Sequence, residues 1–146
     1  MAIWFDLLAA CGSNAEAVAG IYPVHVRLDL RGFLGDDEVP CTLIAPAGNE
    51  TIIDSNFAQQ DCYSYPVIYV LITLQDRDFV VPGPELDIRE LLRQQIDQRT
   101  LSGVSSVWDT SIEPLDLGSF EQARNTVYEV TGFLATYLSW ESRTNP

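Results

Sequence analysis

Residues 127–142, VYEVTGFLATYLSWES, predict a β-strand that is very long for a chain of 146 residues. At about 3.3 Å per residue, such a strand would extend for roughly 53 Å. A compact domain of this chain length has a diameter of only roughly 38 Å. The strand must therefore bend, with Gly132 as the expected bend or bulge, or one of its ends must project from the domain.

The residues beyond Gly132 are apolar on both faces of this predicted strand. One face carries Leu134, Leu138 and Trp140, and the other carries Phe133, Ala135 and Tyr137. A projecting strand leaves backbone N–H and C=O groups unpaired, and an exposed end with two apolar faces is unfavourable in water. Burial against a neighbouring subunit explains both features, whereas a bent, central strand is the alternative. We predict an oligomer interface made of Leu134, Tyr137, Leu138, Trp140 and Arg143.

Other strands are indicated on either side of a strongly apolar segment. Residues 65–74, YPVIYVLITL, are apolar on both faces and predict a central strand. Residues 21–30 alternate like a half-buried strand, and two short strands are expected around a turn at Gly48 and Asn49. Residues 54–64 are polar and are expected to be irregular, and residues 114–125 are expected to form a connection. A further strand places Trp108 in the core, on one face with Val104 and Ile112.

Two segments have helical periodicity. Residues 2–11 carry an apolar stripe that Gly12 is expected to end, with a second short turn after Ser13. A second helix is expected around residues 85–99, with a buried stripe of Ile88, Leu91, Leu92 and Ile96. Strands cluster in the sequence and do not alternate regularly with helices. We therefore predict a single α+β domain, residues 1–146, whose mostly antiparallel sheet is flanked by these two helices.

The charge of the chain is strongly negative. Twenty-one carboxylates oppose eight basic residues, giving a net charge of −13, and every basic residue is an arginine. The absence of lysine excludes Schiff-base and P-loop lysine chemistry. Tight binding to nucleic acid or to an anionic membrane needs clustered bases, so neither is expected. No run of about 18 apolar residues predicts a membrane span.

Reactive groups are few and scattered. Cysteines 11, 41 and 62 have no paired spacing and predict free, buried thiols. His25 is the lone histidine, and no nucleotide-binding or nucleophile-elbow motif occurs. The acidic runs 36–38 and 76–78 are typical of solvated loops, and Glu113 with Asp116 makes a weak acid–base candidate. We expect no catalytic residue, no metal and no cofactor.

Aromatic residues provide one further candidate site. The side chains that could line an apolar pocket are Tyr63, Tyr65, Tyr69, Trp108 and Trp140. Aromatic residues in strands more commonly belong to a core or an interface.

Three segments in order resemble the phage tail terminator or tail completion family. They are YPVIYVLITLQDRD, then LDIRELLRQQIDQRTLSGVSSVWDTSIEP, and then a final strand ending in WESR. The resemblance lies in this order of an apolar strand, a helix, a strand that ends in an acidic turn with proline, and a long last strand. The N-terminal helix that leads into YPVHVRLDL also fits.

The resemblance implies a virion structural protein without catalytic residues. Such proteins form a ring, usually six-fold, which caps the tail tube and joins it to a neck or connector protein. The genomic DNA passes through the lumen without specific binding. Assembly in the host cytoplasm and a final location in the tail or neck would follow. A head–tail connector, a capsid decoration protein and a small unrelated ligand-binding domain are the alternatives.

Overall fold

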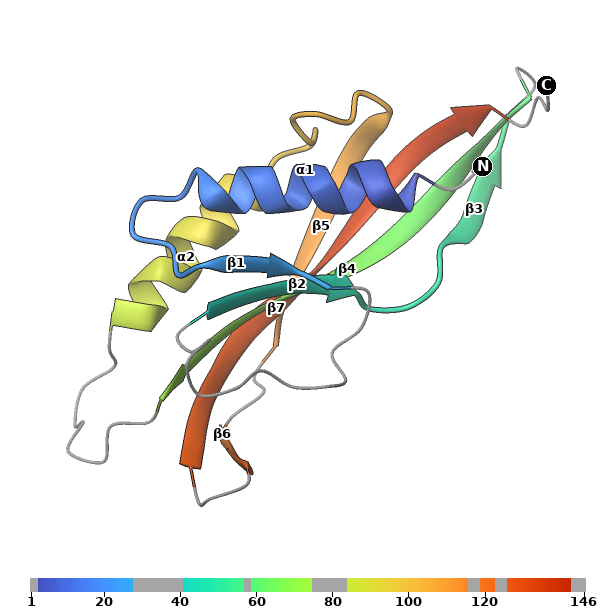
Figure 1. Cartoon of the computed structure of the whole chain (residues 1–146). Helices are drawn as coiled ribbons and strands as arrows, with labels where there is room; N and C mark the ends of the chain where they lie inside the picture. The colour runs from blue at the N-terminus through green and yellow to red at the C-terminus, as the bar shows by residue number, and fades with distance from the viewer. Residues whose placement is uncertain are drawn as a thin grey trace.

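The computed structural model describes residues 3–27, 41–56, 59–74, 84–115, 119–122 and 126–142. In these residues, two helices lie on one face of a seven-stranded, mostly antiparallel sheet (Figure 1). The predicted α+β class, with an N-terminal helix and a second helix before the last strands, is confirmed.

The helices are α1 (Trp4–Glu16) and α2 (Pro84–Ile96). The strands are β1 (Val24–Val26), β2 (Cys41–Pro46), β3 (Thr51–Ser55), β4 (Gln60–Leu74), β5 (Val107–Leu115), β6 (Ser119–Gln122) and β7 (Thr126–Ser142). The strand order is β1-β2-β4-β7-β5, with β3 paired to the first part of β4 and β6 to the first part of β7. Among these described strands, only β1 and β2 pair in parallel.

The long C-terminal strand is confirmed, and a second long strand accompanies it. The 17 residues of β7 pair with the 15 residues of β4, in a register that is continuous from Gln60 opposite Ser142 to Leu74 opposite Tyr128. On its other side, β7 pairs with β5 and β6. In Figure 1 both long strands run the length of the sheet and curve beneath α1.

A projecting end of the last strand is therefore the wrong interpretation. The backbone of β7 is paired by its own chain, because β4 begins at Gln60 and is as extended as β7 itself. Residues 60–64, expected to be irregular from their polar composition, form the first part of β4. The short strand β6 was likewise missed inside the predicted connection 114–125.

Gly132 allows a close approach of two strands and does not form a bulge. The register between β4 and β7 is uninterrupted at this residue. A Cβ atom on residue 132 would lie 2.0 Å from the carbonyl oxygen of Tyr69. The carbonyl of Gly132 also accepts a 3.3 Å hydrogen bond from Arg89 of α2. Any larger side chain would have to push the two central strands apart.

The main core lies between the helices and the helix-facing side of β4 and β7. It includes Leu7, Leu8 and Cys11 of α1, Tyr65, Val67, Tyr69 and Leu71 of β4, Leu92 and Ile96 of α2, and Phe133, Ala135 and Tyr137 of β7. The alternation in 65–74 and 133–137 thus points every second side chain toward the helices. A smaller cluster of Cys41, Leu43, Val70 and Ile72 is buried on the other face.

Both helices differ in detail from the sequence-based prediction. The helix α1 continues through Gly12, which is buried, and a Cβ there would lie 3.0 Å from Cγ2 of Val26. The glycine therefore brings α1 close to β1 and does not end the helix. Leu92 and Ile96 are buried as predicted, but Leu91 is 46% exposed because only a narrow side of α2 faces the sheet.

Candidate interaction surface

An apolar strip lies on the helix-free face of the sheet. This tryptophan strip consists of Ile68, Trp108, Leu134, Leu138 and Trp140. Ile68 is the cross-strand partner of Leu134, and the rings of Trp108 and Trp140 stack with centroids 6.5 Å apart and an interplanar angle of 22°. Trp108 is 38% exposed, and the other members are half-buried. Two stacked indoles at a surface resemble the aromatic enrichment of protein–protein interfaces.

A β-bulge places Trp108 on this face. Val107 lies opposite Ser139 on the helix-facing side, whereas Asp109 lies opposite Leu138 on the helix-free side, and the register shifts between them. The extra residue, Trp108, packs on Trp140. The prediction that Trp108 lies in the core is therefore wrong, and Val107, 1% exposed, fills the core position. A count of alternating residues cannot reveal a bulge, because one inserted residue turns all the side chains that precede it in the strand to the opposite face of the sheet.

The same face is acidic. Asp54, Asp109 and Glu113 pair across the sheet with Cys62, Leu138 and Leu134 respectively, so their side chains share the face of the strip. His25 of β1 lies opposite Leu43 and therefore points to this face as well, near the other end of the sheet. Arg99 also approaches this face, and its Nε lies 3.9 Å from Oδ1 of Asp109.

The predicted interface residues fall into three groups. Leu134, Leu138 and Trp140 lie together on the tryptophan strip. Tyr137 points to the opposite face and is 0% exposed, so its assignment to an interface is wrong. The reason is the strand period of two, which sends Tyr137 into the core of its own molecule. Arg143 lies outside the described residues.

The edges of the sheet carry features that obstruct pairing with another strand. The β3 edge has a register shift between Ile52 and Asp54. The β5 edge has the shift around Trp108 and contains Pro114, which has no N–H to donate. Bulges, prolines and charged residues at sheet edges are devices against edge-to-edge association. At the opposite end of the sheet the edge strand β1 is only three residues long, which also limits pairing. A contact with another protein is therefore favoured at the face of the sheet over these three edges.

A polar cluster on the helix-facing side attaches α1 to the long strands. The Tyr65 hydroxyl donates a hydrogen bond to Oε2 of Glu141 and accepts one from the backbone N–H of Ile3 at 3.2 Å. Burial raises the pKa of Glu141, and burial together with the bond to Glu141 raises the pKa of Tyr65. Oε1 of Glu141 is buried without a hydrogen-bond partner. These groups fasten the start of α1 to the long strands.

The indole of Trp4 extends this attachment. Its Nε1 donates to Oε2 of Glu50 at 2.6 Å, and this bond lowers the pKa of Glu50. The ring of Trp4 also meets that of Tyr65 edge-on, with centroids 5.0 Å apart. The start of α1 is thus fixed by aromatic packing and two carboxylates.

The tyrosines and tryptophans proposed as one apolar pocket do not meet. Tyr65 and Tyr69 are fully buried beneath the helices, whereas Trp108 and Trp140 lie on the other face of the sheet. The Tyr69 and Tyr137 hydroxyls share a 2.5 Å hydrogen bond, and burial raises the pKa of both. This pair satisfies its own polar atoms inside the core.

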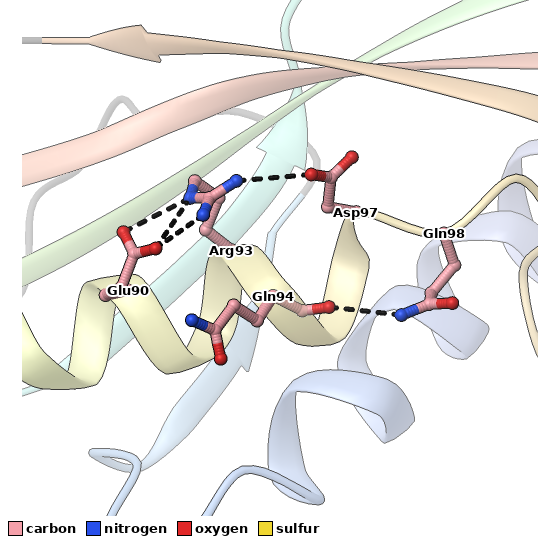
Figure 2. Close-up of polar contacts among 5 residues, drawn as sticks. All are labelled: Glu90, Arg93, Gln94, Asp97 and Gln98. Carbon is pink, nitrogen blue, oxygen red and sulfur yellow. Dashed lines mark hydrogen bonds and ion pairs between the residues drawn. The ribbon is translucent and has the colours of Figure 1, made fainter.

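Two shallow hollows lie on the helical layer. The larger, of about 560 Å³, is bordered by small residues together with one acid and one amide: Asp6, Ala9, Ala10, Ser13, Asn14, Ala17, Ser102 and Gly103. The smaller, of about 290 Å³, lies beside it between Asn14 and the end of α2. Close to this end, Arg93 is occupied by ion pairs to Glu90 at 2.5 Å and to Asp97 at 3.2 Å (Figure 2).

Reactive chemistry is sparse in the described part of the chain. Its residues include no group of three or more His, Cys, Asp or Glu placed to hold a metal ion. All three cysteines are free and buried, as predicted, and burial raises the pKa of Cys11. The acidic runs 36–38 and 76–78, and Asp116, lie outside the described residues. Within those residues no helix is both long and apolar enough to cross a membrane.

Comparison with protein-family models and with curated proteins finds no match to this chain.

Proposed function

We propose that this chain is a virion structural protein of the tail terminator type, whose copies form a closed ring, six-fold in the family it resembles. The observation that carries the proposal is the tryptophan strip. Leu134, Leu138 and Trp140 continue it along β7, and Trp108 is 38% exposed at its end. An ordered, apolar, aromatic strip at a protein surface favours a protein partner.

The arrangement of secondary structure is compatible with the family resemblance. A central apolar strand, a helix, a strand and a long last strand follow one another as β4, α2, β5 and β7. In this chain the strands β4, β5 and β7 belong to one sheet, and α2 packs on that sheet. A head–tail connector would share these features, and its ring stoichiometry would distinguish it.

The charge supports a conduit for DNA. A ring of six copies would carry a charge of six times −13, or −78. A strongly negative ring repels phosphates, so DNA would pass through without being held. The proposed partners are a tail tube protein, a neck or connector protein, and other copies of this chain. The proposed location is the tail or neck of a virion.

The test is the oligomeric state of the purified protein, measured by mass photometry with and without a tail tube protein, together with negative-stain images. We expect a closed ring in at least one condition. A protein that stays monomeric in both conditions contradicts the proposal. A trimer that binds a capsid shell would instead identify a decoration protein.

Two matched variants locate the joint. Leu138→Glu places a charge in the centre of the tryptophan strip and is expected to abolish the ring. Ile52→Glu places the same charge on the exposed β3 edge, where Ile52 is 56% exposed, and is expected to leave the ring intact. Circular dichroism checks that both variants are folded. The reverse pattern would place the joint at the edge of the sheet.

A further inference from the structure

We infer that the acidic border of the tryptophan strip keeps copies of this chain apart at low ionic strength, and that ring assembly is switched on as salt screens this border. The acidic border consists of Asp54, Asp109 and Glu113. The inference rests on the proposed function, since it concerns the regulation of the contact that forms the ring. It does not depend on which surface of a second copy covers the strip, because every copy carries the same net charge of −13.

The acidic border lies on both sides of the strip. Asp109 and Glu113 are on β5, which pairs with β7, whereas Asp54 is on β3, which pairs with β4. The strands β4 and β7, which carry most of the strip, therefore lie between the two parts of the border. Asp54 and Glu113 are exposed, and the side chain of Asp109 is 41% exposed. A second copy that covers the strip comes close to all three carboxylates.

The described bases neutralise this border only in part. Arg99, whose side chain is 80% exposed, lies 3.9 Å from Asp109, whereas Asp54 and Glu113 have no ion pair with a base of the described residues. His25 points to the same face from β1, but β2, β4 and β7 separate it from β5. At about 4.8 Å per strand this separation is roughly 19 Å, which is far beyond the reach of an ion pair. The border thus keeps a negative charge where a neighbouring copy would bind.

Two opposing free energies then act on the contact between copies. Burial of the tryptophan strip favours the contact, and this hydrophobic contribution does not arise from charge. Repulsion between copies that each carry a large negative charge opposes the contact and keeps such proteins monomeric. The Debye length is about 30 Å at 0.01 M salt and about 3 Å at 1 M, so the repulsion acts across an interface in dilute salt and is screened in concentrated salt. Ionic strength therefore decides which contribution is larger.

The salt dependence of the ring tests the inference. Mass photometry of the parent protein in sodium chloride from about 0.01 M to about 1 M measures the fraction of protein in the ring. We expect mostly monomer at the lowest salt concentration and mostly ring at the highest. A ring fraction that stays constant or falls as salt rises would overturn the inference and leave the proposed function standing. Protein that forms no ring at any salt concentration, with or without a tail tube protein, contradicts both.

Charge variants test whether the acidic border is responsible. Asp109→Asn and Glu113→Gln each remove one negative charge beside the strip and are expected to shift the midpoint of assembly to lower salt. Glu16→Gln is the control, because it makes the same change in net charge at the exposed end of α1, on the other side of the sheet. Its midpoint should move less. Equal shifts in all three variants would overturn the inference, because the total charge and not the border would then set the salt dependence.

Arg99→Gln makes the opposite change at the border. It removes the base that lies beside Asp109, and the fold should tolerate the loss because the side chain of Arg99 is 80% exposed. We expect this variant to form the ring only at higher salt than the parent does. Circular dichroism checks that every variant is folded. A midpoint for Arg99→Gln that equals that of the parent, or that moves to lower salt, would overturn the inference.

Discussion

The Tyr65 hydroxyl connects Glu141 on β7 to the backbone N–H of Ile3 at the start of α1. Tyr65 is 0% exposed and Glu141 is 9% exposed, so the two groups form a buried link between the first helix and the last strand. Helix α1 has no side-chain cap at Ile3. The hydroxyl oxygen of Tyr65 instead accepts a hydrogen bond from the backbone N–H of Ile3, which has no partner within the helix. The single hydroxyl of Tyr65 thus accepts a hydrogen bond at the start of a helix and donates one to a buried carboxylate.

Removing that hydroxyl should destabilise the protein. Tyr65→Phe leaves the Glu141 carboxylate without its described donor and is expected to lower the free energy of unfolding by about 1–3 kcal/mol. Urea denaturation followed by circular dichroism measures the change. Tyr63→Phe is the matched control, since Tyr63 is half-buried two residues away, and its effect should be smaller. Equal effects of the two changes would contradict the structural role of this bond.

Stability should also depend on pH through Glu141. Burial raises the pKa of this carboxyl, so the folded protein holds the proton more strongly than the unfolded chain does. The resulting stabilisation is present at low pH and is lost as pH rises from the ordinary glutamate range through the folded pKa. Glu141→Gln should therefore gain stability relative to the parent as the pH rises above roughly 4.3, the pKa of an ordinary glutamate.

Glu50→Gln provides the contrast for this pH dependence, because the hydrogen bond from Trp4 lowers the pKa of Glu50. The stability of Glu50→Gln relative to the parent should therefore fall as the pH rises through the ordinary glutamate range. Urea denaturation at several pH values provides the comparison. A difference between Glu141→Gln and the parent that stays constant with pH would show that the Glu141 carboxyl does not titrate as the structure indicates.

Gly132 should tolerate no side chain. In Gly132→Ala the new Cβ would meet the backbone of Tyr69 at 2.0 Å, and a backbone atom cannot rotate away. We expect a loss of roughly 3 kcal/mol, at the upper end of overpacking effects. Gly48→Ala is the control, since its Cβ would lie 3.6 Å from Cγ of Pro66, which is an ordinary contact. Similar melting temperatures for both variants would contradict the close approach of β4 and β7.

The two faces of the sheet should respond differently to the loss of an aromatic ring. Phe133 is 1% exposed and stacks on Tyr69 at 5.0 Å, so Phe133→Ala should cost about 3–5 kcal/mol of stability. Trp108→Ala removes a ring that is 38% exposed and should cost about 1 kcal/mol, mainly the stacking on Trp140. Thermal unfolding of the monomeric proteins at low concentration measures both effects. A larger loss of stability for Trp108→Ala than for Phe133→Ala would indicate that Trp108 lies in the core after all.

The sequence by itself determined the features that depend on local pattern. The run 65–74, apolar on both faces, identified a central strand, residues 127–142 were predicted as a long strand, and helical periodicity located α1 and α2. The odd number and spacing of the cysteines predicted free thiols, which the structure confirms. These features follow from residues close in the chain, whose burial is decided by which side of one element they occupy.

Tertiary structure decided whatever depends on partners distant in the chain. Residues 60–64 are polar, and they became a strand because residues 138–142 pair with them. Gly12 was expected to end a helix, whereas in the structure it lets α1 approach Val26 closely. Trp108 was expected in the core but lies at the surface, because β5 contains one extra residue at the point where it pairs with β7. In each case a backbone or packing demand from a distant segment outweighed a local preference of less than about 1 kcal/mol per residue.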